Sequence, residues 1–194
     1  MKKRFNRHYD MKSRFSKAIR RNMVHASQGV HECIIVLDGL KPDFNIGKII
    51  RSADAFGIKE VHLTRVEYFD PEPAKGSFRW VVFYQHQDFA ACYGHLQGRG
   101  FTLYSMVADG SHMLGRETLP DKVVFIFGHE EFGVSFTESE YPDIKPLTIQ
   151  QWGRVQSLNV SVAASVAMFE YTRQHGRQDI EPPARTPSWS RDEK

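Results

Sequence analysis

Short apolar runs alternate with helix-like segments along most of this chain, and that alternation limits the folds open to it. Strands are predicted at CIIVL (33–37), VHLT (61–64), WVVFYQ (80–85), FTLYSMV (101–107), VVFIFG (123–128) and KPLTI (145–149). Helices are predicted over 46–57, 88–98 and 155–171. Buried strands that alternate with helices predict an α/β fold, with a parallel sheet and helices on both faces.

Three loops that follow predicted strands carry most of the polar groups suited to chemistry. They read KPDFNIGKIIRSADAFG (41–57), GHEEFGVS (128–135) and VQSLNVSVAASVAMFEY (155–171), the last of which begins a helix. The carboxyl ends of parallel strands meet at one edge of a sheet, and ligands bind in the crevice outside that edge. We therefore expect the three loops to meet there and form a site.

The third of these loops leads into an apolar helix that opens on polar residues. Residues 160–169 are apolar or small, yet Ser157, Leu158 and Asn159 precede them. A Ser or Asn at the N-cap stabilises a helix by about 1 kcal/mol, but one such residue is enough. The alternative is that this N-terminus holds the polar edge of a ligand.

The basic residues are concentrated at the N-terminus. Residues 1–21 hold nine of the 26 Lys and Arg residues but one of the 23 Asp and Glu residues, so the remainder has a net charge of −5. A basic arm on an acidic body favours a polyanionic partner such as RNA. Phe5, Tyr9 and Phe15 lie among these charges, where they could stack on bases or pack on the domain. The alternative is a solvated tail.

Composition divides the chain into three parts. We expect a basic N-terminal arm (1–30), one globular domain (31–175) and an irregular tail (176–194) that contains three prolines. No apolar run approaches the ~20 residues of a membrane span. The basic N-terminus also lacks the apolar centre of a signal peptide. A cytoplasmic protein without membrane contact is therefore expected.

Several common motifs are missing from the sequence. It has no GxGxxG, GxxxxGK[ST], HExxH or GxSxG pattern, which argues against a dinucleotide site, a P-loop, a zinc protease and a serine hydrolase. Cys33 and Cys92 are the only cysteines and form no CxxC pair. Neither a disulfide framework nor a metal site is expected from this spacing.

Three segments of the sequence, in order, resemble the motifs of a known family. NIGKIIRSADAFG (45–57), FGHEEFGVS (127–135) and GRVQSLNVSVAAS (153–165) are similar to motifs one, two and three of the SPOUT RNA ribose methyltransferases, in the TrmH/SpoU family. The resemblance covers about residues 32–174. The third motif is especially similar to that of the tRNA guanosine 2′-O-methyltransferases.

This resemblance implies both a fold and a reaction. The fold is an α/β knot, in which the C-terminal segment threads a loop to form a deep trefoil knot, an exception to the rule against knotted chains. The reaction is methyl transfer from S-adenosyl-L-methionine to a ribose 2′-hydroxyl of RNA, with no metal. The resemblance also implies a homodimer whose reaction centre lies near the interface.

The resemblance assigns the catalytic residues, which are Arg51, Asn45, Glu130, Ser157 and Asn159. Arg51 matches the motif-one arginine that activates the 2′-oxygen. Because a guanidinium is nearly always protonated, the alternative for Arg51 is a clamp on a phosphate and on the developing alkoxide. Asn45 is expected to hold the motif-one turn and position Arg51, with a simple helix cap as the alternative.

The other motif residues complete the implied site. Glu130 is expected to brace it, and Ser157 and Asn159 to order the knot loop on the substrate side. His129 is an alternative general base, because its titration range suits that task. The side chains and backbone expected to contact the cofactor are those of Ser105, Met106, Gly128, Ile149 and Leu158.

One segment departs from the family pattern. The family commonly has Ile-Pro-Met before the glycine of motif three, whereas this chain has Ile149, Gln150, Gln151 and Trp152 before Gly153. The loss of the Pro and Met is expected to change the shape of the cofactor pocket and with it the affinity for the cofactor.

The RNA substrate has two alternatives within the resemblance. Ribosomal RNA enzymes of the family often carry a separate N-terminal RNA-binding domain, and the ~30 residues before the first strand are too few for one. We therefore expect tRNA rather than rRNA as the substrate. A third alternative is an RNA-binding protein on the same scaffold that has no activity, against which the retained motif residues argue.

Overall fold

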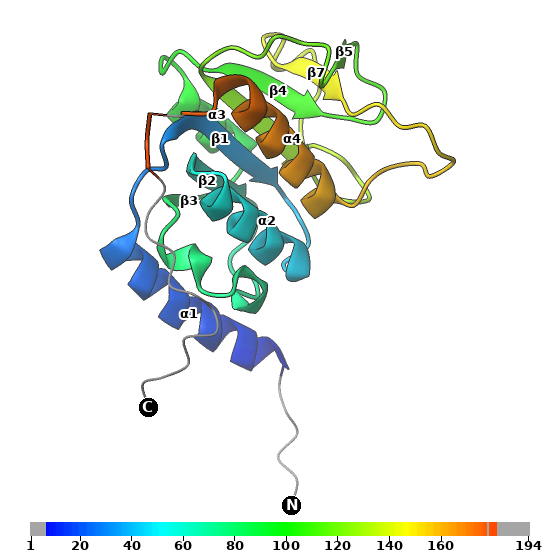
Figure 1. Cartoon of the computed structure of the whole chain (residues 1–194). Coiled ribbons are helices and arrows are strands. Elements are labelled where there is room, and N and C mark those ends of the chain that lie inside the picture. Colours follow the sequence, from blue (N-terminus) through cyan, green and yellow to red (C-terminus); the bar gives the residue numbers. More distant parts are fainter. Residues whose placement is uncertain (1–6, 178, 182–194) are drawn as a thin grey trace, which may run out of the picture.

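A seven-stranded parallel sheet forms the centre of the molecule (Figure 1). The computed structural model describes residues 7–177 and 179–181. The strand order is β3-β2-β1-β6-β4-β7-β5, and every neighbouring pair is parallel. The strands are β1 (His31–Asp38), β2 (Ile58–Thr64), β3 (Phe83–His86), β4 (Thr102–Met106), β5 (His112–Met113), β6 (Val123–Gly128) and β7 (Lys145–Thr148). The parallel α/β fold predicted from the sequence is confirmed.

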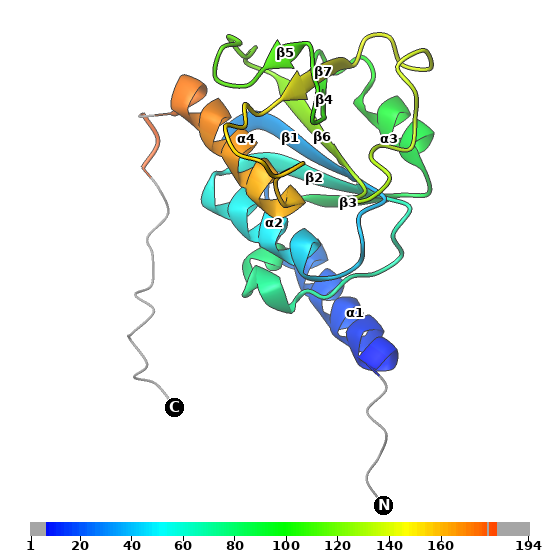
Figure 2. The same ribbon diagram turned by 90° about the vertical axis from the view of Figure 1, so that its right-hand side faces the viewer.

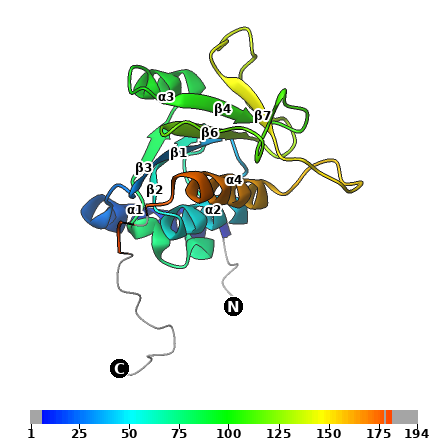
Figure 3. The same ribbon diagram turned by 45° about the horizontal axis from the view of Figure 1, so that its top comes forward.

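Helices cover both faces of this sheet (Figure 3). One face packs on α2 (Phe44–Ala55), α4 (Val160–His175) and the short 3-10 turns η1 (Glu72–Ala74) and η2 (Ser77–Arg79). The other face packs on α3 (Phe89–Leu96). Strand β1 contributes to both cores, with Ile35 and Leu37 on one side and Ile34 and Val36 on the other. All four side chains are fully buried, as expected for a central strand of a parallel sheet.

The basic arm forms a helix, α1 (Arg7–His25), which the sequence analysis did not predict. Phe15 on this helix is buried, with its ring centroid 5.0 Å from that of Phe69 and 6.2 Å from that of Phe78. The buried Asn22 amide donates to the Phe78 and Val81 carbonyls, at 2.6 and 2.7 Å. From Asp10 to His25 the arm is therefore packed on the domain (Figure 2).

The strand register aligns the carboxyl ends of the central strands. Asp38, the last residue of β1, pairs with Thr64 of β2 on one side and with Gly128 of β6 on the other. On the far side of β6, Phe127 pairs with Met106, the last residue of β4. The loops that follow these strands consequently leave the sheet at the same edge.

Two predicted elements begin later than expected. The strand predicted over 80–85 starts at Phe83, because Trp80 still belongs to the η2 turn and its N–H donates to the Ser77 carbonyl at 2.9 Å. The helix predicted over 155–171 starts at Val160, because the extended backbone of Asn159 (φ −56°, ψ 136°) ends the helix on that side. Residues 150–159 form an irregular loop instead.

The C-terminal tail lies mostly outside the described residues. Of the segment 176–194, residues 176, 177 and 179–181 are described, and they form neither a helix nor a strand. None of the helices within 7–177 is long and apolar enough to cross a membrane.

Candidate active site

A cavity of about 560 Å³ opens at the carboxyl edge of the sheet. Its walls come from the ends of β4 and β6, the end of β7 with the loop that follows it, and the first turn of α4. The predicted site residues in its lining are Met106, Gly128, Glu130, Ile149, Ser157, Leu158 and Asn159. Its volume lies in the range typical of small-molecule sites, ~300–1,000 Å³. The second and third polar loops therefore line one cavity, and the first loop reaches it only through the hydrogen bonds of Asn45 to Glu130 and Asn159.

The loop after β6 doubles back so closely that it requires glycine at its base. The N–H and carbonyl groups of His129 and Gly133 exchange two hydrogen bonds of 2.8 Å. A Cβ on Gly128 would lie 2.2 Å from the Gly133 carbonyl carbon and from the Val134 nitrogen, so no side chain fits there. Gly133 itself has a φ of 73°, in the left-handed region that favours glycine.

A buried carboxylate fastens this loop to the sheet. Asp38 is 1% exposed and accepts hydrogen bonds from the Thr64 hydroxyl at 2.6 Å and the Ser135 N–H at 2.6 Å. The Ser135 hydroxyl donates a third at 3.0 Å. Hydrogen bonds to a charged group stabilise by about 1.5–3 kcal/mol each, and an unpaired buried charge is costly. The position of the loop is thus fixed by β1 and β2.

Three of the predicted catalytic residues form a continuous polar network at the mouth of the cavity. The Asn45 amide donates to Glu130 Oε1 at 2.9 Å, and the Asn159 amide donates to the Asn45 carbonyl oxygen at 3.3 Å. The Lys41 backbone N–H donates to Glu130 Oε2 at 3.2 Å. The network joins the N-termini of α2 and α4 to the loop after β6, although these segments lie far apart in sequence.

This network keeps Glu130 ionised. Partial burial opposes the charge, but the hydrogen bonds from Asn45, from the Glu130 N–H and from the Lys41 N–H outweigh it and hold the pKa of Glu130 below its ordinary value. At neutral pH Glu130 is therefore a hydrogen-bond acceptor and does not donate a proton.

The two asparagines differ in their relation to the helices. Asp43 is the N-cap of α2 and accepts from the Asn45 N–H at 3.2 Å, so the alternative that Asn45 is only a helix cap is wrong. Asn159 is the N-cap of α4, and its Oδ1 accepts from the Ser161 N–H at 2.9 Å. Because the Asn159 Nδ2 also reaches Asn45, the side chain both caps the helix and joins the network.

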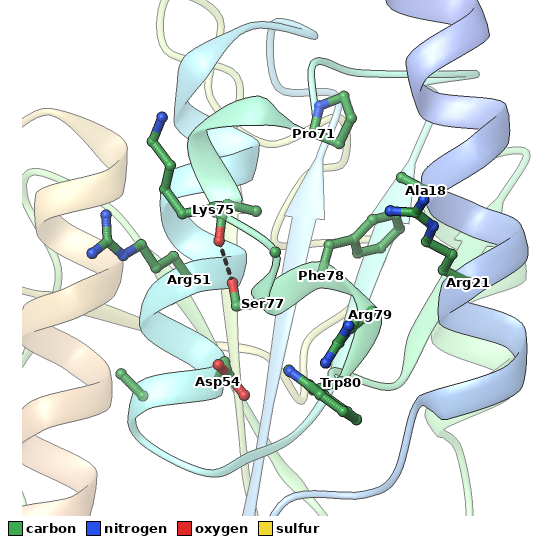
Figure 4. Close-up of a pocket in the computed structure, with 13 residues that line it drawn as sticks. Ala18, Arg21, Arg51, Asp54, Pro71, Lys75, Ser77, Phe78, Arg79 and Trp80 are labelled. Carbon is green, nitrogen blue, oxygen red and sulfur yellow. Dashed lines mark hydrogen bonds between the residues drawn. The ribbon is translucent and has the colours of Figure 1, made fainter. Parts of the chain in front are cut away.

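Arg51 lies outside this network. An α-helix rises about 1.5 Å and turns about 100° per residue, so the six residues between Asn45 and Arg51 place them ~9 Å apart along α2 and on different faces. The exposed Arg51 side chain lines a second cavity of about 570 Å³, between α2 and α1 (Figure 4). Arg21, Lys75 and Arg79 line the same cavity, and Asp54 is its only acidic residue within the described chain.

Comparison with known proteins decides the family. The model of the SpoU rRNA methylase family matches residues 32–169, which include the whole sheet except His31. The chain belongs to this family. The tRNA (guanosine(18)-2′-O)-methyltransferase of Thermus thermophilus is 36% identical over 147 residues, which is 72% of this chain and 74% of that protein.

Two further relatives of this SpoU family chain differ in their RNA. The 23S rRNA (guanosine-2′-O-)-methyltransferase RlmB of Nitrosomonas europaea is 30% identical, over 75% of this chain and 57% of that protein. A solved structure described as giving insight into the 2-OH methylation of C/U34 on tRNA has a TM-score of 0.62 and 28% identity, over 79% of this chain and 99% of that one.

Ser105 does not reach the cavity, and His129 reaches it with one ring nitrogen already engaged. Successive side chains of a strand point to opposite faces, so Met106 lines the cavity while Ser105 does not. The Ser105 hydroxyl is buried and has no partner among the described residues. His129 lines the cavity, but its Nδ1 accepts from the Glu131 N–H at 3.0 Å. The neutral ring therefore carries its proton on Nε2, which leaves no free basic nitrogen and disfavours the general-base alternative.

Sequence reasoning missed other residues that shape the site. Asp38 was visible as the polar residue that ends the CIIVLD run, but its role in holding another loop was not. Thr148 lines the cavity, and its hydroxyl donates to the Ala108 carbonyl at 2.7 Å, which ties β7 to the loop after β4. Gln151 also lines the cavity, and its Oε1 is buried without a partner among the described residues.

We predict that Asn45→Ala raises the pKa of Glu130 toward its ordinary value. The substitution removes the side-chain hydrogen bond that lowers this pKa most, while the burial that opposes ionisation remains. NMR titration of the side-chain carboxyl carbons measures the change. Glu140 is an internal control, since its pKa is lowered by the N–H and hydroxyl of Thr137, neither of which contacts Asn45. An unchanged Glu130 titration would show that the network does not hold this carboxylate.

Proposed function

We propose that this protein transfers a methyl group from S-adenosyl-L-methionine to a ribose 2′-hydroxyl of RNA, with a tRNA guanosine as the target. The observation that carries the proposal is the network of Asn45, Glu130 and Asn159 at the mouth of a carboxyl-edge cavity, in a chain of the SpoU family. The tRNA relative has the higher identity and is matched over more of its length than the rRNA relative, which favours tRNA. An rRNA target is the second candidate.

The residues in the cavity fit this cofactor. The buried, unpartnered Oε1 of Gln151 offers a hydrogen-bond acceptor to an amino group, so the departure of this chain from the family's Pro-Met still suits an adenine. Met106, Ile149 and Leu158 supply apolar walls, and the bare backbone at Gly128 leaves the loop close to the sheet. When bound, S-adenosyl-L-methionine supplies an electrophilic methyl group that needs no metal.

The residues at the mouth of the cavity position the ribose 2′-hydroxyl that accepts the methyl group. Glu130, held ionised, accepts from Asn45 and keeps that amide in place, and Asn159 is held by its own helix cap. Ser157 lines the cavity beside them and presents an exposed hydroxyl to the substrate. A preorganised set of this kind contributes through orientation, because its side chains do not rearrange during the reaction.

Arg51 acts as a phosphate clamp in this proposal. It is exposed and shares its cavity with Arg21, Lys75 and Arg79, which together form a cationic surface suited to an RNA backbone. Its place among other cations, outside the network of Asn45, Glu130 and Asn159, supports the clamp over the alternative of a general base. Arg51 reaches the reacting ribose through the phosphate that it holds.

We predict that Arg51→Ala lowers the rate of methyl transfer by about 10²-fold, the cost expected when the loss of a clamp displaces a reacting group by about 1 Å. Calorimetry with S-adenosylhomocysteine should still show one site per chain, since Arg51 does not line the cofactor cavity. Transfer of labelled methyl groups to tRNA measures the rate. Arg177→Ala, an exposed arginine paired with Asp179, is the control and should retain full activity.

Ribose-methylation mapping of total RNA, with and without the protein in its cells, tests the function directly. A single lost tRNA site supports the proposal, and a lost rRNA site supports the second candidate. If no S-adenosylhomocysteine binds at millimolar concentration, the proposal of an enzyme fails. The remaining alternative is then an RNA-binding protein without activity.

The basic arm contributes to RNA binding as part of this cationic surface. Some of its charges are paired within the molecule: Lys12 contacts Glu67 at 2.9 Å, and Arg14 contacts Asp70 at 3.1 Å and Glu72 at 2.9 Å. Arg21 lines the basic cavity together with Lys75 and Arg79. Removal of residues 1–21 would also strip the buried Phe15 from the core, so point substitutions separate binding from folding.

We predict that the variant Arg21→Gln, Lys75→Gln, Arg79→Gln binds tRNA more weakly and with a smaller salt dependence. If each side chain contacts one phosphate, the slope of log affinity against log salt falls by about 0.7–0.9 per residue. Fluorescence anisotropy at several salt concentrations measures it, and cofactor affinity should stay the same. Lys122→Gln removes a charge at the amino end of β6 and is the control. An unchanged slope of log affinity against log salt would show that the RNA does not bind at this cationic surface.

The protein is a homodimer in this proposal, joined through α2 and α4. These helices lie side by side, with Ser52 Oγ 2.9 Å from Ser165 Oγ. On their outer surface α4 exposes two large apolar side chains, Val162 at 48% and Phe169 at 55%, which an interface would cover. The resemblance of the three motifs also supports a deep trefoil knot, in which the C-terminal segment threads a loop, and a methyltransferase domain over 31–175.

We predict that Val162→Asp with Phe169→Asp converts the dimer into a monomer, because both charges would be buried at the interface. Multi-angle light scattering at micromolar concentration measures the mass. Met23→Asp, on the exposed surface of α1, should remain dimeric. A wild-type chain of monomeric mass with full activity would contradict the proposed assembly.

A further inference from the structure

A cluster of histidines and a cysteine lies buried under α3, on the face of the sheet opposite α2 and α4 (Figure 3). His62 on β2 and Cys92 on α3 are both fully buried, and His86 ends β3. One nitrogen of each imidazole and the cysteine sulfur lie within 4.8 Å of one another. None of these residues takes part in the methyl-transfer site.

The separations within the cluster suit a tetrahedral metal. His62 Nδ1 lies 3.0 Å from His86 Nε2 and 3.7 Å from Cys92 Sγ. In a tetrahedral zinc site, with bonds of about 2.0–2.1 Å to nitrogen and about 2.3 Å to sulfur, two nitrogens lie ~3.4 Å apart and a nitrogen and a sulfur ~3.6 Å apart. Two of the three separations are therefore close to the tetrahedral values, and the third, between His86 Nε2 and Cys92 Sγ, is no more than 4.8 Å.

Hydrogen bonds behind His62 orient it for such a role. Its Nε2 donates to the buried Glu60 Oε2 at 3.1 Å, so the lone pair of the neutral ring is on Nδ1, the atom that faces His86 and Cys92. Glu60 Oε1 in turn accepts from Arg99 at 2.7 Å and from Gln28 at 3.0 Å. A carboxylate behind the outer nitrogen of a ligating histidine is a recurring feature of metal sites.

We propose that His62 Nδ1, His86 Nε2 and Cys92 Sγ bind a zinc ion that fastens β2, β3 and α3 together. Two imidazoles and one thiolate are ligands that zinc prefers. The half-buried His86 side leaves the fourth position to water. Binding forms two Zn–N bonds and one Zn–S bond. It breaks the S–H bond of Cys92, whose proton goes to the solvent, and the Nε2–H bond of His86, whose neutral ring then carries its proton on Nδ1; no electron is transferred.

A second grouping of Glu60, His62 and His95 competes for His62. It would require Glu60 to ligate, but the oxygens of Glu60 already accept from Arg99, Gln28 and His62. His95 is also exposed, unlike Cys92. The first grouping is therefore the site, and Glu60 is a positioning residue for His62.

Cobalt substitution of the full chain tests the proposal. The wild-type protein with one equivalent of Co²⁺ should show a thiolate-to-cobalt charge-transfer band and a tetrahedral visible spectrum. The band should disappear in Cys92→Ala and remain in Cys33→Ala, which removes the other buried cysteine. A wild-type spectrum without the thiolate band would overturn the proposal, even if a variant failed to fold.

Zinc affinity, measured by competition with a chromophoric chelator, tests the individual residues. Glu60→Gln should weaken binding by about 10–100-fold, as expected when a carboxylate behind a ligand is lost, and His86→Gln by more than that. His95→Gln should have no effect. Equal zinc affinity in wild type and His86→Gln, or a loss confined to His95→Gln, would contradict the assignment. Because metal binding is read without RNA or cofactor, its outcome does not depend on methyl transfer.

Discussion

The candidate active site depends on the hydrogen bonds that the Asp38 carboxylate accepts. This carboxylate lies at the end of the central strand β1 and accepts from Thr64 on β2 and from Ser135 beyond the turn after β6. Since a buried charge must be paired, the loop that carries Glu130 cannot leave the sheet without exposing or orphaning Asp38. The turn at Gly128 then brings the loop back onto the strand end, where no Cβ would fit.

Groups that stabilise the fold also make up the site. Asn159 ends the irregular loop after β7 by capping α4, and the same side chain donates to Asn45. Asp43 caps α2 and thereby leaves the Asn45 amide free for Glu130. A helix cap fixes the backbone of its residue, so each of these polar groups is held by secondary structure rather than by the ligand. This explains why the apolar helix α4 begins with polar residues.

The sequence predicted correctly those features that depend on a local pattern of apolar residues. Buried runs such as 33–37 and 123–128 are nearly continuous apolar strands, and the loops after them could be placed at one edge from strand direction alone. The helix of the arm was missed because seven of its 19 residues are charged and its buried residues are few, namely Phe15 and Asn22. The cavity that Arg51 lines could not be read from the motif, since it forms where α1 and the η turns pack against α2. Residues such as Thr148 and Gln151 acquire a role only when their loop is folded.

The edge strand β3 explains why a metal site would be useful on the face of the sheet that α3 covers. Strand β3 pairs with β2 over four residues and has no neighbour on its other side in the described chain. A short edge strand of a parallel sheet gains little from its ladder, so side-chain contacts must hold it. His62, His86 and Cys92 lie 24 and six residues apart in sequence, spacings that match no metal motif, and the absence of a CxxC pair concealed them. These three residues lie under α3, on the face of the sheet opposite α2 and α4. A zinc ion bound there would hold β3 to β2 and α3, and it would lie away from the cavity at the carboxyl ends of β4, β6 and β7.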